Sequence, residues 1–146
     1  MKTVIKIESL SHDDLVNLFS TALYGNPAFD CVIDSKYEDD DNIGITAQDC
    51  YEDKIAKILL NGGKVEIVDL YSNGETYGNN KEAYWDGICG RAFYPICLND
   101  IMAGLELAAK KHQYLIKLFA IDDGGFDLIA ADMLLQYITF NELIYG

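Results

Sequence analysis

Apolar residues recur every three or four positions in several stretches of the chain, a spacing that places them on one face of a helix. This spacing predicts helices that begin near Ser11, Thr46, Asn99 and Asp127, and a short helical segment over residues 114–120. Other stretches alternate apolar and polar residues, which is typical of strands with one buried face. They predict strands at residues 2–8, 30–35, 42–46, 65–70 and 92–98.

Several residues at the ends of these stretches match known helix-end patterns. Ser11 is followed three residues later by Asp14, and Thr46 by Asp49, the arrangement of a capping box at a helix start. Glycine after a helix readily takes the left-handed conformation, so residues 61–63, Asn-Gly-Gly, should end the helix that begins near Thr46. That helix should bury Tyr51, Ile55, Ile58 and Leu59, and the 100–112 helix should bury Ile101, Leu105 and Ala108.

The last predicted helix runs from Asp127 to about Ile138 and is apolar on nearly every side. Asp132 is its only charged residue, and such a helix usually lies at the centre of a fold. Pro95 within the 92–98 strand indicates an edge position or a bulge, because proline cannot donate to a sheet. Together these elements predict one α+β domain over residues 1–146, in which a small, mainly antiparallel sheet packs against about four helices.

Residues 71–91 form the longest stretch without a clear element, and we call them the aromatic loop. They combine four glycines with Tyr71, Tyr77, Tyr84 and Trp85, and Arg91 closes the stretch. Tyr, Trp and Arg are common at binding hot spots, so this loop could grip a protein partner or stack on a nucleobase. The alternative is that its rings fold back as a satellite of the core, and the sequence favours neither reading.

Charge adds a constraint that the hydrophobic pattern does not contain. The 146 residues include 24 acidic against 11 basic residues, a net charge of −13, and half of the chain is hydrophobic. Such a chain can bury a core, but it is unsuited to nucleic-acid phosphates and to anionic membranes. Nine of the acids lie within residues 28–53, which we call the acidic segment: Asp30, Asp34, Glu38, Asp39, Asp40, Asp41, Asp49, Glu52 and Asp53.

The densest part of the acidic segment runs from Glu38 to Asp41. A calcium loop of the EF-hand type starting at Asp39 would need a ligand at Ile43 and a glutamate at Cys50, so the pattern fails and no metal is predicted. Closely spaced carboxylates can imitate a phosphate backbone and be steered to a basic groove. They can also serve solubility alone.

Candidate catalytic residues are few. His12 and His112 fall at predicted helix ends and are expected to be solvated there, and Cys31, Cys50, Cys89 and Cys97 have no zinc spacing and are expected to be free and mostly buried. An enzyme with an unrecognised site near Cys89, Arg91 or His112 stays open, but the sequence favours a non-enzymatic protein without a cofactor. The start of the chain reads as a strand rather than a signal peptide, so a cytoplasmic location is expected.

The C-terminal segment from Asp127 to Gly146 carries a motif of Asp132, Leu135-Gln136, then Phe140-Asn-Glu142 and Tyr145-Gly146. It resembles the ending of small acidic uncharacterised proteins of phages, plasmids and conjugative elements of gut bacteria. Those proteins usually have glycine where this chain has Asn141, so the turn before Glu142 is expected to differ. Residues 60–67 and 98–107 are similar to the middle of that family, which implies that residues 71–91 are an insertion.

The resemblance implies a mobile-element origin but no activity. Joined with the acidic segment, it leads to the hypothesis of a binding protein that inhibits a host nucleic-acid-directed defence enzyme, of the anti-CRISPR or anti-restriction type. The alternative hypothesis is a binder or sponge of a small nucleotide-like ligand, held by the aromatic loop. The expected binding residues are Glu38, Asp39, Asp40, Asp41, Tyr71, Tyr77, Tyr84, Trp85 and Arg91.

Overall fold

The computed structural model describes residues 9–38, 40–120 and 125–146, and in them the chain forms an α+β fold, as predicted. The strand expected over residues 2–8 lies outside the described residues. The helices are α1 (His12–Leu23), α2 (Tyr51–Leu60), α3 (Leu98–Lys111), α4 (Gln113–Ala120) and α5 (Leu128–Phe140). The strands are β1 (Phe29–Val32), β2 (Val65–Asp69), β3 (Tyr84–Asp86) and β4 (Arg91–Ile96), and two 3-10 turns are η1 (Ser35–Tyr37) and η2 (Asp41–Ile43).

The predicted helix starts are correct for α1 and α5 and wrong for α2 and α3. The Ser11 hydroxyl accepts the Asp14 N–H at 3.1 Å and the Asp14 carboxylate accepts the Ser11 N–H at 2.9 Å, which is the expected capping box of α1. The carboxylate of Asp127 likewise accepts the Ala130 N–H at the start of α5. In α3 the helix begins at Leu98, because Asp100 accepts the Cys97 N–H at 2.8 Å and thereby places the cap two residues before Asn99.

The start of α2 lies five residues after the predicted Thr46. Asp49 does accept the Thr46 N–H at 3.0 Å, but this contact closes a turn that precedes the helix. The strand predicted over 42–46 is also wrong, since its first residues form η2, and Gly44 with a φ of +78° ends that turn. Tyr51, expected to be buried, is 44% exposed because it opens the helix and donates from its hydroxyl to the Cys31 carbonyl.

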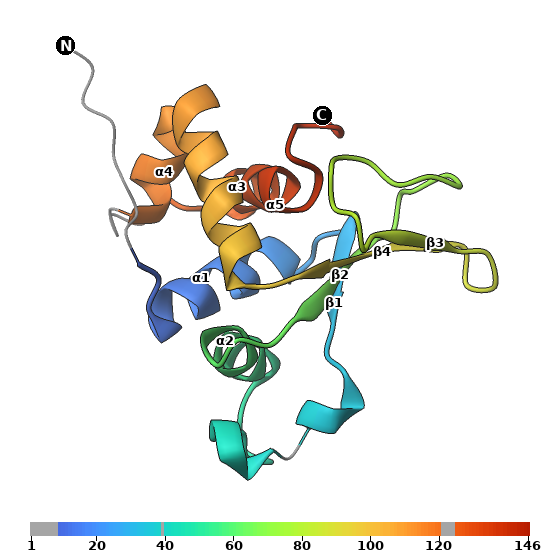
Figure 1. The fold of residues 1–146 in the computed structure, drawn as a ribbon. Coiled ribbons are helices and arrows are strands. Elements are labelled where there is room, and N and C mark those ends of the chain that lie inside the picture. The colour runs from blue at the N-terminus through green and yellow to red at the C-terminus, as the bar shows by residue number, and fades with distance from the viewer. Residues whose placement is uncertain (1–8, 39, 121–124) are drawn as a thin grey trace.

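The four strands form one antiparallel sheet in the order β1-β2-β4-β3 (Figure 1). Buried residues alternate along β1 and β4, so one face of the sheet joins the core and the other is partly exposed. Pro95 lies in the second strand from the edge, yet β3 pairs only as far as Phe93. The position of Pro95 is therefore a local edge, and Asn80 donates to its carbonyl at 2.8 Å.

The core is one continuous cluster in which α5 is central, as its apolar sequence predicts. This helix packs against α1, α3 and α4, and nine of its residues are buried. Gly104 brings α3 against α5, because a Cβ at this position would lie 2.4 Å from the Ile138 Cα. In Figure 1, α3, α4 and α5 lie together at one end of the molecule, and η1 and η2 project at the other. None of the helices described is long and apolar enough to cross a membrane.

Candidate functional site

The central part of the acidic segment, between β1 and α2, forms the projecting end of the molecule that carries η1 and η2. Two of its acids start the turns of this end: Asp34 accepts the Lys36 N–H at 3.0 Å at the start of η1, and Asp40 accepts the Asn42 N–H at 3.0 Å at the start of η2. These short-range contacts hold the backbone in tight turns, a habit of Asp ahead of a turn. The side chains of Glu38 and Asp41 are exposed and form no hydrogen bond or ion pair with any described residue.

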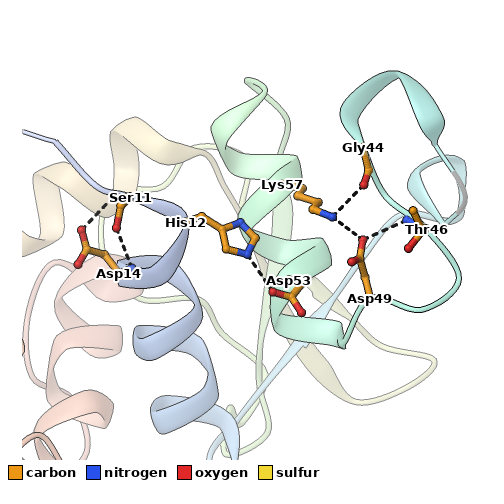
Figure 2. A network of polar contacts seen from close by, with 8 residues as sticks. All are labelled: Ser11, His12, Asp14, Gly44, Thr46, Asp49, Asp53 and Lys57. Atoms are coloured by element: carbon orange, nitrogen blue, oxygen red, sulfur yellow. Dashed lines mark hydrogen bonds and ion pairs between the residues drawn. The ribbon is translucent and has the colours of Figure 1, made fainter.

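One lysine fastens this segment to α2. The Lys57 ammonium donates to the Gly44 carbonyl at 2.8 Å and to the Asp49 carboxylate at 2.7 Å, and Figure 2 shows these contacts converging with the Thr46 N–H. The hydrogen bond from Lys57 lowers the pKa of Asp49 below its ordinary value. Lys57 therefore compensates Asp49, which lies after the turns, and the described carboxylates of the turns themselves have no ion pair within the described residues.

The two histidines have structural partners. His12 Nε2 lies 2.8 Å from Asp53 Oδ1, a contact that joins α1 to α2 in Figure 2. His112 Nδ1 contacts the hydroxyl of Tyr137 on α5. Both side chains thus tie helices together, whereas the sequence predicts solvated helix ends. Of the eight acids of the acidic segment that the structure describes, only Asp49 and Asp53 belong to an ion pair within the described residues, so the segment keeps a large surplus of negative charge.

The aromatic loop divides into rings that join the core and rings that stay exposed. Tyr77 packs edge-on against Phe140 and Tyr145, and Trp85 is half-buried against the core. Tyr71 is 52% exposed, and Tyr84 is 43% exposed. The loop also contains β3, so it is largely folded rather than an open lid. Neither of the two cavities described below is lined by these four rings or by Arg91, which is exposed at the start of β4.

Tyr84 lies on the exposed face of the sheet. Its ring stacks on Phe93 with 5.2 Å between centroids and 12° between planes, and its hydroxyl donates to Glu66 of β2 at 3.3 Å. Val32 on β1 is also 40% exposed. This face therefore presents an aromatic pair and an exposed valine beside a carboxylate, and aromatic residues are enriched at protein interfaces.

A groove of about 650 Å³ links this face of the sheet to the acidic segment. Asp34 at the start of η1, Glu66 of β2 and Glu82 of the aromatic loop line it, together with Lys36 and Lys64. Lys64 is bound by Glu82 at 2.7 Å, which leaves it little free positive charge. The two regions singled out by the sequence thus meet along one acidic groove, although they are far apart along the chain.

The C-terminal motif has a structural role. Gln136 is buried, its amide oxygen accepts the N–H groups of Ile144 and Tyr145 at 2.9 Å, and its amide nitrogen donates to Asp132 at 2.8 Å. Asp132 also accepts from Asn26 at 2.9 Å. The motif residues therefore fasten the end of the chain onto α5.

Asn141 takes the conformation that a glycine would take. Its φ is +64°, the left-handed region in which Asn is tolerated, and it forms the C-terminal cap of α5. The expected difference from the turn of the proteins that this segment resembles stays a prediction. Asn141 also accepts the Asn79 N–H at 3.0 Å through its side chain, a contact that ties the aromatic loop to the end of α5.

Asp69 is a buried carboxyl that makes stability depend on pH. Burial raises its pKa above the ordinary carboxyl value, and hydrogen bonds from Tyr145 (2.7 Å) and Tyr71 (2.9 Å) offset part of that rise. Because the unfolded state ionises first as pH rises, Asp69 costs nothing below the ordinary pKa and lowers stability at higher pH. We expect Asp69→Asn to gain stability relative to wild type from pH 4 to pH 7 in urea unfolding.

A matched control for this experiment is Asp41→Asn, which removes one exposed charge without removing a hydrogen bond. The advantage of Asp69→Asn over that control should grow with pH. An advantage that is constant or shrinks from pH 4 to pH 7 would show that burial does not disfavour the charged form of Asp69.

The four cysteines differ in burial, and none of them belongs to a metal-binding cluster within the described residues. Cys31 is buried, and burial raises the pKa of its thiol above the ordinary value. Cys50 and Cys89 are exposed and Cys97 is half-buried, so the expectation of mostly buried thiols is wrong. The described residues contain no group of three or more His, Cys, Asp and Glu side chains placed to hold a metal ion.

A second cavity, of about 420 Å³, was not foreseen from the sequence. We call it the α3–α5 cavity, because Asp100 of α3 and Thr139 of α5 lie in its wall opposite Asn80 and Lys81 of the aromatic loop. Its polar groups come from segments up to 77 residues apart, Lys64 and Asn141 being the extremes. A single threonine in an apolar helix gives no sequence signal for such a site.

Comparison of the chain with protein-family models, with curated proteins and with solved structures found no match. Its functional residues are therefore identified by their own geometry and chemistry. Two features stand out on that basis: the acidic segment with its adjoining groove, and the α3–α5 cavity.

Proposed function

We propose that this chain is a non-enzymatic acidic binding protein of a phage or mobile element that inhibits a host nucleic-acid-directed defence enzyme, of the anti-CRISPR or anti-restriction type, by protein–protein contact in the cytoplasm. The observation that carries the proposal is the set of carboxylates at the projecting η1–η2 end. Glu38 and Asp41 there are exposed and lack a cationic partner within the described residues.

Unpaired exposed carboxylates cost stability through mutual repulsion, so a fold gains nothing from gathering them at one end. A partner with a basic groove gains from them, because complementary charge speeds association and fixes orientation. Enzymes that act on nucleic acids have such grooves, since they must bind phosphates. The net charge of −13 adds long-range attraction to the same kind of partner.

The groove beside the acidic segment supplies the second part of the interface. Asp34 and Glu66 extend the negative surface from the start of η1 to β2, whereas Glu82 in the same groove is paired with Lys64. The stacked pair Tyr84 and Phe93 and the exposed Val32 provide apolar area on the same face of the sheet. In protein interfaces, buried aromatic residues usually contribute most of the binding energy, and charged residues surround them at the rim.

The phage or mobile-element origin is supported by the resemblance of the C-terminal segment to small acidic proteins of such elements. The residues that carry this resemblance, Asp132, Gln136 and Tyr145, hold the chain end in place. The resemblance therefore supports a shared fold and setting, whereas the inhibitory role rests on the acidic surface.

The test is inhibition of DNA cleavage by a panel of purified restriction enzymes and CRISPR nucleases. We expect at least one nuclease to be inhibited, and its half-inhibitory concentration to rise about tenfold for Glu38→Gln/Asp41→Asn, since exposed ion pairs contribute about 0.2–1 kcal/mol each and two charges are removed together with their long-range attraction. Raising the salt from about 50 to 200 mM should weaken inhibition further by screening.

The matched control is Glu106→Gln/Glu142→Gln, which removes two exposed charges from α3 and the chain end and changes the net charge equally. This variant should inhibit like the wild type. If neither added salt nor the Glu38→Gln/Asp41→Asn variant weakened inhibition, the acidic surface would not be the interface. If no nuclease of the panel were inhibited, the proposed function would be contradicted.

A further inference from the structure

The chain contains two Asn-Gly pairs, Asn61-Gly62 at the end of α2 and Asn73-Gly74 in the aromatic loop, and the proposed function assigns no role to either. In such a pair the backbone nitrogen of the glycine can attack the side-chain amide carbon of the asparagine before it, and glycine has no Cβ that would obstruct the approach. Because the two reacting groups are neighbours in one chain, the attack depends on whether the fold leaves both of them free.

The pair at the end of α2 is engaged by the helix. The side-chain nitrogen of Asn61 donates to the Lys57 carbonyl at 2.8 Å. The Gly62 N–H donates to the Leu59 carbonyl at 3.2 Å. Both reacting groups are thus held by other atoms, and the attack would have to break the two hydrogen bonds first.

The pair in the aromatic loop has no such contacts. Asn73 and Gly74 are exposed, lie outside the helices and strands, and make no hydrogen bond with any described residue. A Cβ placed on Gly74 would meet no atom within 4 Å, so the space beside the pair is open. The neighbouring hydrogen bond from the Ser72 hydroxyl to the Glu75 carbonyl, at 2.5 Å, spans the pair without using its reacting groups. The fold therefore leaves the nucleophile and the electrophile of this pair free.

We propose that Asn73 is a site of spontaneous deamidation, whereas Asn61 is protected by the end of α2. The backbone nitrogen of Gly74 gives up its proton and bonds to Cγ of Asn73, while the side-chain nitrogen of Asn73 takes up a proton and leaves as ammonia. One water molecule then opens the cyclic imide at either of its two carbonyls, which gives aspartate or isoaspartate at position 73. Either product adds one negative charge to a chain whose net charge is −13.

The experiment follows both asparagines while the folded full chain is incubated for several weeks near physiological temperature and pH. Trypsin cuts after lysine, so the two pairs fall in separate peptides, residues 58–64 and 65–81. Mass spectrometry detects a gain of about 1 Da for each deamidation, and fragmentation places the gain within each peptide and identifies isoaspartate. We expect Asn73 to convert about tenfold or more faster than Asn61, because two hydrogen bonds must open before Asn61 can react.

A parallel incubation in concentrated urea separates the effect of the fold from that of the sequence. There the two rates should become similar, because the same pair of residues reacts at both positions and the native hydrogen bonds are gone. Asn73→Gln is the matched variant, since its longer side chain disfavours the five-membered ring. It should abolish the conversion at position 73 and leave the rate at Asn61 unchanged.

Three results would overturn the proposal: Asn73 converts no faster than Asn61 in the folded chain, the product at position 73 contains aspartate without isoaspartate, or the difference between the two rates persists in urea. The chemistry is independent of the acidic segment, so each of these results would leave the proposed function standing.

Discussion

Replacing Phe140 by alanine is expected to lower the free energy of unfolding by about 3–5 kcal/mol. Its ring is fully buried and lies within 5.2–5.8 Å, centroid to centroid, of the rings of Phe29, Tyr77, Tyr94 and Tyr145. These rings come from β1, the aromatic loop, β4 and the chain end. Truncation leaves a cavity where all four meet, because each is also held by backbone or side-chain contacts and cannot collapse inward freely.

Urea unfolding followed by circular dichroism measures this effect. Phe93→Ala is the control, since that ring is half-buried on the exposed face of the sheet and stacks only on Tyr84. The free energy of unfolding of this control should fall by about 1–2 kcal/mol, because it loses a partly buried apolar side chain and one pair of stacked rings. The total free energy of unfolding of a domain of this size is only about 5–15 kcal/mol. Phe140→Leu therefore provides a milder variant if the alanine variant does not fold. Equal losses at positions 140 and 93 would contradict the central role of Phe140.

The second large effect is expected at Gly104, where alanine should cost about 3 kcal/mol or more. Its added Cβ would lie 2.4 Å from the Cα and 2.7 Å from the backbone nitrogen of Ile138. Backbone atoms cannot rotate away as a side chain can, so α3 and α5 would have to separate along their shared contact. Alanine favours a helix over glycine by about 1 kcal/mol, and the clash has to exceed this gain.

The adjacent Ala103→Gly is the control for helix propensity. Ala103 is exposed on α3, so glycine there should cost about 1 kcal/mol through backbone entropy alone. Both variants are compared with the wild type by urea unfolding. A Gly104→Ala variant that is as stable as the wild type would show that the close approach of α3 and α5 is not required.

The binding surfaces differ in how far the sequence could reveal them. Runs of acids such as Glu38 to Asp41 can be read directly from the chain, because exposed charges need no partner to be recognised. For the aromatic loop, the sequence leaves two roles open: binding a partner, or packing against the core. In the structure Tyr77 and Trp85 pack against the core, whereas Tyr71 and Tyr84 are exposed. Tertiary contacts decide this, since each ring is apolar enough for either place.

Local signals determined the elements wherever a short-range contact forms the structure. The Ser11–Asp14 box, the Asp127 cap and the apolar run of α5 act within one or two turns, so they could be predicted without the rest of the molecule. The same sequence pattern at Thr46 and Asp49 led to a wrong helix start. There the Asp49 carboxylate accepts the Thr46 N–H, as Asp14 accepts that of Ser11, but the contact closes a turn before α2. The bond is local, but whether a helix follows it depends on what the next residues can bury.

What only the tertiary structure decided is how distant segments meet. The strand order, the groove between η1 and the aromatic loop, and the α3–α5 cavity each depend on packing between residues far apart in the chain. The Thr139 hydroxyl illustrates the reason. By sequence it is one polar residue in an apolar helix, and only the packing around α5 leaves its hydroxyl buried without a hydrogen-bond partner in the described structure. Hydrophobic patterning specifies that a face is buried, whereas the partner that buries it is set by the packing of the whole fold.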